Sequence, residues 1–243
     1  MPLVLDGTTG FSGGGGVATS TALGSSALFT NSSGANLVAI GYQAGYFTTA
    51  GPNVFVGSQA GYTNSTGTNN IGIGYQAGYS NTTATNNVAV GYQANYSNQT
   101  MSNTTAIGYQ AGYTNTGDNE LVAVGYRALY LSTTGTNNTA LGHNTLAANT
   151  TGSHNLAVGS AALNVNTTGS YNTAIGRVAL VANTTGSNNT VIGYQAGAGV
   201  TTESNNTYIG YQCGSGATGG GNVFLGASTF TGYSGSNQVA YKV

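Results

Sequence analysis

One short motif recurs at a nearly constant interval along the whole chain. A clear copy is Asn189-Thr190-Val191-Ile192-Gly193-Tyr194-Gln195-Ala196-Gly197. The glycine after the aliphatic residue, which we call the anchor glycine, recurs every 17 residues, with two intervals of 16. A fixed short period over a whole chain predicts a repeat architecture in which each unit packs mainly on its neighbours. The anchor glycines are Gly7, Gly24, Gly41, Gly57, Gly74, Gly91, Gly108, Gly125, Gly142, Gly159, Gly176, Gly193, Gly210 and Gly226.

The residue types around the anchor glycine predict the fold class. With the anchor as position 0, position −1 is aliphatic, positions −2 and +3 are mostly alanine, and position −4 is mostly asparagine. Several glycines and β-branched threonines in each repeat disfavour a helix, whereas asparagine, serine and glycine suit tight turns. We therefore predict an all-β fold, a parallel β-solenoid with about 14 coils of 17 residues and like residues stacked in columns.

The aliphatic residue at position −1 is predicted to form the core of this solenoid. One such side chain per coil, with two alanines, gives little apolar burial to offset the entropy lost in ordering a coil. We therefore expect further apolar surface to be buried between chains in a homotrimer, either intertwined or packed. The predicted core column is Ile40, Val56, Ile73, Val90, Ile107, Val124, Leu141, Val158, Ile175, Ile192, Ile209 and Leu225.

Changes in composition divide the chain into four regions. Residues 1–34 are predicted to be an N-terminal attachment region with degenerate first coils, and residues 35–130 to be tyrosine-rich coils. Residues 131–186 are leucine-rich coils, and residues 187–243 are the final coils with a glycine-rich C-terminal tip. Leucine takes position +4 in the third region, where most other coils have glycine. We expect it to thicken the core or to tighten contact between chains.

The charge and cysteine content exclude several classes of partner. Only 3% of the residues are charged, and the formal net charge is −1. Arg127, Arg177 and Lys242 are too few to neutralise a phosphate backbone, so no nucleic-acid partner is expected. The single cysteine, Cys213, leaves no disulfide framework and no cysteine zinc site. We find no secretory signal pattern and no stretch near the ~18 apolar residues of a membrane span, so membrane insertion is not expected.

The titratable residues do not suggest catalysis. General acid–base chemistry needs titratable groups that converge on one site, and the carboxylates are scattered over different coils. His143 and His154 stand at different repeat positions and have no acidic neighbour, so neither a Ser-His-Asp set nor a metal site is expected. We therefore expect no enzyme activity, no cofactor and no metal. The acidic residues are Asp6, Asp118, Glu120 and Glu203.

Polar and aromatic columns accompany the aliphatic one. Glutamine at position +2 is predicted to form an amide ladder, and asparagine at position −4 a turn ladder. Tyrosines at positions +1 and +5 would stabilise a solenoid by stacking alone. An exposed tyrosine also offers an apolar ring and a hydroxyl to a sugar, so these columns are candidate glycan or receptor contacts. The candidates are Tyr42, Tyr46, Tyr75, Tyr79, Tyr92, Tyr96, Tyr109, Tyr113, Tyr126 and Tyr130.

The unit Asn-Thr-Ala-Ile-Gly-Tyr-Gln-Ala, with Asn-Thr-Thr-Gly-Ser-Asn between copies, resembles repeats of bacteriophage tail fibres. It is also similar to the shorter head repeats of trimeric autotransporter adhesins. The opening Leu3-Val4-Leu5-Asp6-Gly7-Thr8-Thr9-Gly10 resembles the start of many tail-fibre proteins. The resemblance implies a homotrimeric structural protein of the virion tail, assembled in the host cytoplasm. It would attach to a tail or baseplate protein through its N-terminal region and present an adhesion surface to a host glycan or receptor.

Two other functions stay open at this point. A bacterial surface adhesin or extracellular filament would use an uncapped solenoid end for head-to-tail contact. The expected absence of a secretory signal and of a C-terminal membrane anchor favours a virion protein over an adhesin. An ice-binding solenoid is suggested by aligned threonine pairs. These are Thr133-Thr134, Thr150-Thr151, Thr167-Thr168 and Thr184-Thr185.

Overall fold

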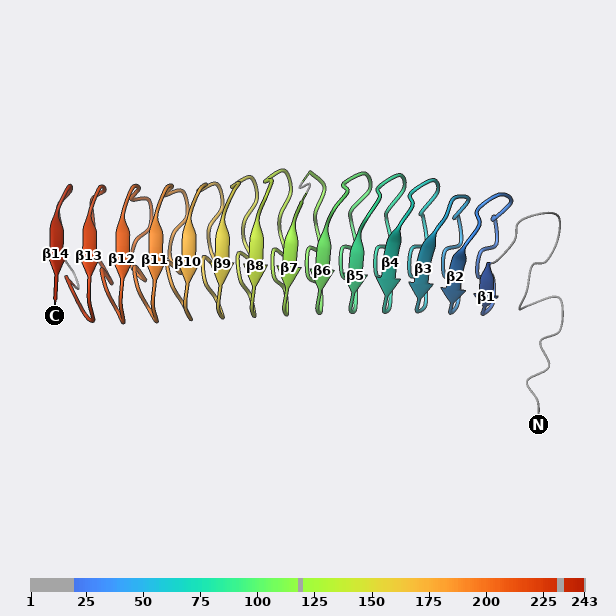
Figure 1. The fold of residues 1–243 in the computed structure, drawn as a ribbon, viewed down its shortest axis with the longest axis horizontal. Helices are drawn as coiled ribbons and strands as arrows, with labels where there is room; N and C mark the ends of the chain where they lie inside the picture. The colour runs from blue at the N-terminus through green and yellow to red at the C-terminus, as the bar shows by residue number, and fades with distance from the viewer. Residues whose placement is uncertain (1–19, 118–119, 231–233, 243) are drawn as a thin grey trace, which may run out of the picture. The chain divides into compact units, whose positions relative to one another are not determined.

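The computed structural model describes residues 20–117, 120–230 and 234–242. They belong to two compact units, an N-terminal unit (Met1–Asn119) and a C-terminal unit (Glu120–Val243). Each unit is a parallel β-solenoid with one short strand per coil (Figure 1), and the described residues contain no helix. The predicted fold class is therefore confirmed. Accordingly, no described helix has the length and hydropathy to cross a membrane.

The strands of the N-terminal unit stack in chain order. Each pairs in parallel with the next, and residues at equal repeat positions face each other, as Leu23 faces Ile40. The repeat length therefore fixes the register of the sheet. The strands are β1 (Thr21–Leu23), β2 (Leu37–Ile40), β3 (Asn53–Val56), β4 (Asn70–Ile73), β5 (Val88–Val90) and β6 (Thr105–Ile107).

The C-terminal unit follows the same rule. Ile175 of one strand faces Val158 and Ile192 of its two neighbours. The strands are β7 (Val122–Val124), β8 (Thr139–Leu141), β9 (Leu156–Val158), β10 (Thr173–Ile175), β11 (Thr190–Ile192), β12 (Thr207–Ile209), β13 (Val223–Leu225) and β14 (Val239–Tyr241).

The two shortened intervals between anchor glycines leave the strand register intact. Leu37 still faces Asn53, and Thr207 still faces Val223, although each pair is 16 residues apart. The missing residue falls in the polar turn before the strand, at residues 49–52 and 218–221. A turn absorbs the change because a shift inside the strand would move every side chain to the opposite face.

The four regions predicted from composition do not coincide with the two compact units, and they stay predictions. The structure describes the predicted attachment region only from residue 20 onward. The opening motif at residues 3–10 lies outside the described residues.

The predicted core column faces outward, which corrects the sequence analysis. Side chains alternate along a strand, and the residue at position −2 is buried in every strand from β2 to β13. Position −1 must then point away from the interior, and Ile73 and Leu225 are 40% and 41% exposed. In the single chain the whole column is half-buried or exposed. It comprises Ile40, Val56, Ile73, Val90, Ile107, Val124, Leu141, Val158, Ile175, Ile192, Ile209 and Leu225.

The interior is instead filled by complementary side chains at positions −2, +3 and +4. A Cβ atom on Gly61 would lie 2.3 Å from the ring of Phe55, and one on Gly214 would lie 2.7 Å from the ring of Tyr208. Phe55 and Tyr208 at −2 therefore require glycine at +4, whereas Phe224 at −2 stacks on Phe230 at +4 with a centroid separation of 4.7 Å. Where −2 is alanine in the C-terminal unit, leucine fills the space and is fully buried. These leucines are Leu129, Leu146, Leu163 and Leu180, so leucine at +4 thickens the core.

Two buried asparagine ladders connect successive coils and confirm the predicted turn ladder. At position −4, the side-chain oxygen of Asn189 accepts the backbone N–H of Asn206 at 3.0 Å. Its amide donates to the carbonyl of Glu203 at 2.9 Å. At position +7, the amide of Asn166 donates to the carbonyl of Gly169 at 2.9 Å and to the side chain of Asn149 at 2.8 Å. These bonds satisfy polar groups that water cannot reach.

The anchor glycines permit close stacking of the coils. Gly74 has φ of 127°, which L side chains rarely adopt, and a Cβ atom there would lie 2.5 Å from the carbonyl oxygen of Gly91. That neighbour is backbone and cannot move aside. Glycine is therefore required at this position for both conformation and space.

Candidate functional site

The two tyrosine columns form ring stacks in the N-terminal unit; the column at position +5 is continuous, and the column at position +1 is interrupted by Ser58. At position +1, Tyr92 lies between Tyr75 and Tyr109, with centroid separations of 5.2 and 5.1 Å. At position +5, the stack has separations of 5.0 to 5.2 Å. It contains Phe29, Tyr46, Tyr62, Tyr79, Tyr96 and Tyr113. The stacking expected of these columns is confirmed here.

Stacking restricts what the tyrosines offer to a ligand. The rings of Tyr92 and Tyr109 are inclined by only 8°, so their faces are turned toward each other. Stacked rings direct edges and hydroxyls outward, whereas a sugar prefers an open ring face. Tyr42 differs, because serine occupies position +1 in both adjacent coils, and its side chain is 53% exposed.

A glutamine ladder accompanies the tyrosine columns. The amide of Gln76 donates to Gln59 at 2.9 Å, and the amide of Gln93 donates to Gln76 at 2.9 Å. Gln59 donates to Gln43 and Gln110 to Gln93 in the same way, both at 3.0 Å. The predicted amide ladder is therefore confirmed.

Position +2 lies between the two tyrosine positions. In the C-terminal unit the guanidinium of Arg127, which replaces glutamine there, lies 5.5 Å from the ring centroid of Tyr126 and 4.9 Å from that of Tyr130. In the N-terminal unit the pKa of Tyr79 is raised by burial and further by Tyr62 and Tyr75. Hydroxyls of both columns thus lie near one another. We call positions +1, +2 and +5 of residues 42–113 the Tyr–Gln–Tyr strip.

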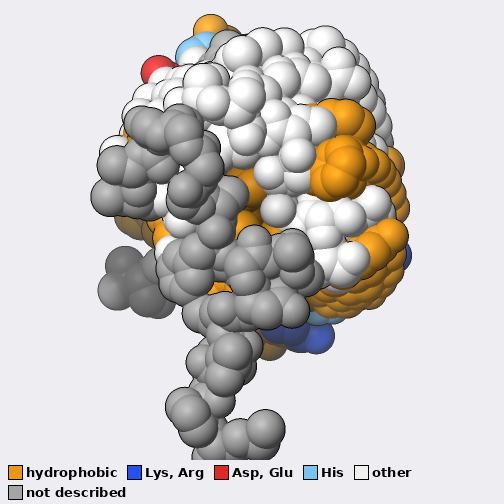
Figure 2. Space-filling view, turned by 90° about the vertical axis from the view of Figure 1, so that its right-hand side faces the viewer, with side chains coloured by type: hydrophobic (Ala, Val, Ile, Leu, Met, Phe, Trp, Pro, Cys, Tyr) orange, Lys and Arg blue, Asp and Glu red, His pale blue; other side chains and the backbone are white. Residues whose placement is uncertain are grey.

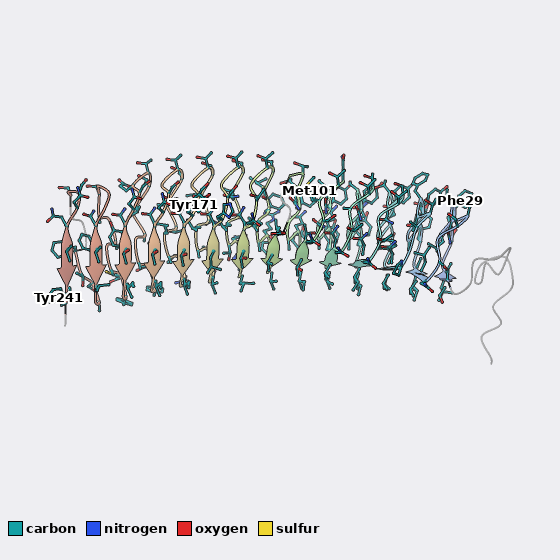
Figure 3. The ribbon with its side chains drawn as sticks, turned by 45° about the horizontal axis from the view of Figure 1, so that its top comes forward. Phe29, Met101, Tyr171 and Tyr241 are labelled. Carbon is teal, nitrogen blue, oxygen red and sulfur yellow. The ribbon has the colours of Figure 1, made fainter. Side chains whose placement is uncertain are left out.

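Within the part of the chain that the structure describes, the remaining titratable residues do not form a reactive cluster. His143 stacks on Tyr126 at 5.0 Å, and His154 stacks on Tyr171 at 4.8 Å. Tyr171, labelled in Figure 3, lies shortly before β10. Among the described residues no three His, Cys, Asp or Glu side chains gather as metal ligands would. Asp6 and Asp118 lie outside the described residues.

Cys213 and Glu203 have local structural roles. Cys213 is buried in the column at position +3, its thiol donates to the carbonyl of Phe224 at 3.2 Å, and burial raises its pKa. Burial alone would also raise the pKa of Glu203. Backbone N–H groups of Thr201 and Thr202 donate to its carboxylate at 2.7 and 2.9 Å and bring that pKa below its usual value.

The threonine pairs that suggested ice binding divide into two roles. The first threonine of a pair bonds to the next coil, as the hydroxyl of Thr133 donates to the carbonyl of Thr150 at 2.9 Å. The second threonine is exposed, as at Thr134 and Thr151. The first threonine of each pair is half-buried and its hydroxyl is already bonded to protein, which weakens the support for an ice-binding face.

One break in the glutamine column gives a testable stability effect. Val178 occupies position +2 with φ of 53°, a conformation costly for a β-branched side chain. Val178→Gln is expected to raise the free energy of unfolding by about 1–2 kcal/mol, because it relieves this strain and adds a bond to Gln195. Val178→Ala should give only part of the gain. Chemical denaturation measures the free energy of unfolding of both variants. If Val178→Gln is no more stable than the wild type, the glutamine ladder does not stabilise the fold.

Comparison of the chain with protein-family models, curated proteins and solved structures found no match. The resemblance to tail-fibre and adhesin repeats therefore rests on the repeat motif. Any function must be argued from the columns themselves.

Proposed function

We propose that this protein is a structural component of a bacteriophage tail, a short fibre that presents an adhesion surface to a glycan on the host. In this proposal the N-terminal region attaches to a tail or baseplate protein, and three copies of the chain associate in the virion. The support is architectural, because asparagine, glutamine and tyrosine ladders connect successive coils. Such ladders favour a mechanical and display role.

Adhesion would depend on repetition of a weak contact. The Tyr–Gln–Tyr strip offers hydroxyls and amides at coil spacing, and Tyr42 adds an exposed ring between serines. Three chains side by side would triple the number of contacts, and linked weak contacts raise the apparent affinity strongly. A polysaccharide with repeated hydroxyl groups is the class of ligand that such a surface fits.

The proposal is tested by the mass of the purified chain and by its binding to a panel of bacterial surface polysaccharides. Light scattering should give three chains per particle, and the trimer should survive SDS at room temperature. Tyr42→Ser should weaken polysaccharide binding at least about fivefold, since about 1 kcal/mol of ring contact is lost. Tyr171→Ser, with 58% exposure but outside the Tyr–Gln–Tyr strip, is the matched control and should bind as the wild type. A monomer that binds no polysaccharide would refute the proposal.

A further inference from the structure

Part of the interior of the N-terminal unit is filled only by small side chains. From residue 56 to residue 117 every buried hydrophobic side chain is alanine. The larger aliphatic side chains of these coils are half-buried or exposed, and Figure 2 shows hydrophobic side chains in rows on the outside of the molecule. In the C-terminal unit, by contrast, position +4 carries buried leucines such as Leu146. Coils with neither a leucine at +4 nor a ring at −2 can therefore leave space inside.

The space beside Gly78, at position +4, is not filled. Gly78 is buried, yet an added Cβ atom there would have only one heavy atom within 4 Å, the Cβ of Ala89 at 3.9 Å. At the equivalent Gly197, an added Cβ atom would meet three side chains at 3.3 to 3.4 Å. Gly72, at position −2 of the same coil, contributes no side chain either. Because protein interiors are otherwise closely packed, this is a local void inside the coils.

The next position +4 along the stack is Asn95, the one polar side chain at this position among the described residues. It is only 2% exposed. Its amide nitrogen donates to the hydroxyl of Thr104 at 2.9 Å, whereas its side-chain oxygen has no hydrogen-bond partner. Buried polar groups are normally bonded to protein or to ordered water. The donor for this oxygen is therefore expected to come from outside the chain.

Thr104 fixes the orientation of the Asn95 amide. Thr104 stands at position −4, where the turn ladder has asparagine in most coils, and its hydroxyl donates to the side-chain oxygen of Asn87 at 2.8 Å. The hydroxyl has a single hydrogen, so toward Asn95 it can only accept. The amide nitrogen of Asn95 must then face Thr104 in the following coil. The oxygen, on the other branch of the amide, is directed away from that coil.

We propose that the void beside Gly78 is a binding site for water and that the side-chain oxygen of Asn95 is its acceptor. Gly78 belongs to the coil that precedes Asn95, on the side away from Thr104. A second acceptor is close, because the carbonyl oxygen of Ala77 would lie 3.0 Å from a Cβ atom on Gly72 and so faces the interior. That oxygen accepts one bond, from the N–H of Gly61 at 2.9 Å, and has a second lone pair. Two acceptors suit the two hydrogens of one water molecule.

The chemistry of the site favours water over an ion or an empty void. The described part of the N-terminal unit, residues 20–117, contains no charged residue, so an ion would be buried without a counter-charge. Purely apolar voids stay dry, whereas a void that offers polar partners holds ordered water. The alanine and glycine walls admit only a small molecule. This site lies inside the coils and is independent of the proposed adhesion surface.

A crystal structure of the full chain at a resolution that shows ordered water tests the site directly. We expect density for water within hydrogen-bonding distance of the Asn95 side-chain oxygen, beside Gly78. Crystals kept under xenon gas should show no xenon there, because xenon enters dry apolar voids. Absence of water density, xenon in the wild-type void, or a protein donor bonded to the Asn95 oxygen would each overturn the proposal.

Two variants test whether Asn95 is the water ligand. Asn95→Ala removes the amide and should lose the water and admit xenon. Asn95→Leu is the matched control that fills the space. Leucine suits this backbone, because Leu129 at the equivalent position has φ of 49° and Asn95 has φ of 51°. This variant should hold neither water nor xenon. Water retained at the same place in Asn95→Ala would show that Asn95 does not bind it.

The same test can be made in solution, without crystals. Nuclear magnetic resonance should show cross-relaxation between the backbone N–H of Gly78 or Asn95 and a long-lived water molecule in the wild type. The signal should disappear in Asn95→Leu. A wild-type protein without this signal would contradict the site, and this measurement does not depend on the folding of either variant.

Discussion

Gly74→Ala is expected to lower the free energy of unfolding by about 4 kcal/mol or more, a size seen only when backbone or core cannot adapt. The added methyl group would lie 2.5 Å from the carbonyl oxygen of Gly91 at a φ of 127°. Coils above and below would have to separate, which breaks the hydrogen bonds between them. In a chain of this length such a loss lowers Tm by about 10 °C or more. Thermal unfolding followed by circular dichroism measures it.

Gly78→Ala in the same coil is the matched control. Gly78 also has positive φ, 61°, but the nearest atom to an added methyl group is the Cβ of Ala89 at 3.9 Å. Its cost is therefore that of the left-handed conformation alone, about 1–2 kcal/mol. Similar losses for the two variants would show that close stacking of the coils does not require glycine at the anchor.

Asn189→Asp is expected to be destabilised by about 3–5 kcal/mol at pH 7, because it buries a negative charge and replaces the donating amide by an acceptor. The amide of Asn189 donates to Asn172 at 3.0 Å and to the carbonyl of Glu203 at 2.9 Å. A carboxylate would oppose two oxygens there, whereas a protonated carboxyl can donate to one of them. Burial would hold the carboxyl pKa above its unfolded value of about 3.9.

The variant's stability relative to wild type should therefore depend on pH. The loss in free energy of unfolding is smallest below about pH 3.9. It grows as the pH rises toward the pKa of the introduced carboxyl in the folded protein, and it is constant above that value. Urea denaturation of both proteins from pH 3 to 7 measures the difference. Asn188→Asp, one residue away but exposed with φ of 59°, should show almost no penalty. A pH-independent loss in Asn189→Asp would contradict the bonding pattern of the ladder.

The repeat period was sufficient to predict the fold class and the polar ladders. A strict interval stacks equal residues, so asparagine at −4 and glutamine at +2 could only meet their own kind in the next coil. Ring stacking followed for the same reason. These predictions needed the period and the chemistry of each side chain, and no knowledge of which way a strand faces.

The prediction of which strand side chains face the interior was wrong. Position −1 has the most regular aliphatic residue, but regularity along the columns does not require burial. The bulkiest residues, Phe55, Tyr208 and Phe224, stand one position earlier, and glycine at +4 accompanies Phe55 and Tyr208. That size compensation marks the interior and is visible in the sequence. The open face of Tyr42 was equally visible, because it needs only serines at the same position in adjacent coils.

The buried asparagines at position +7 would make N-linked glycosylation incompatible with the folded coils. Asn64-Ser65-Thr66, Asn81-Thr82-Thr83 and Asn166-Thr167-Thr168 each form the triplet that accepts N-linked sugars in a eukaryotic secretory pathway. The atom that would carry the sugar is the amide nitrogen, which in Asn64 donates to the carbonyl of Gly67 at 3.1 Å inside the coil. Oligosaccharides attached during synthesis would therefore block closure of the coils. Where no such pathway acts, these amides are free to bond.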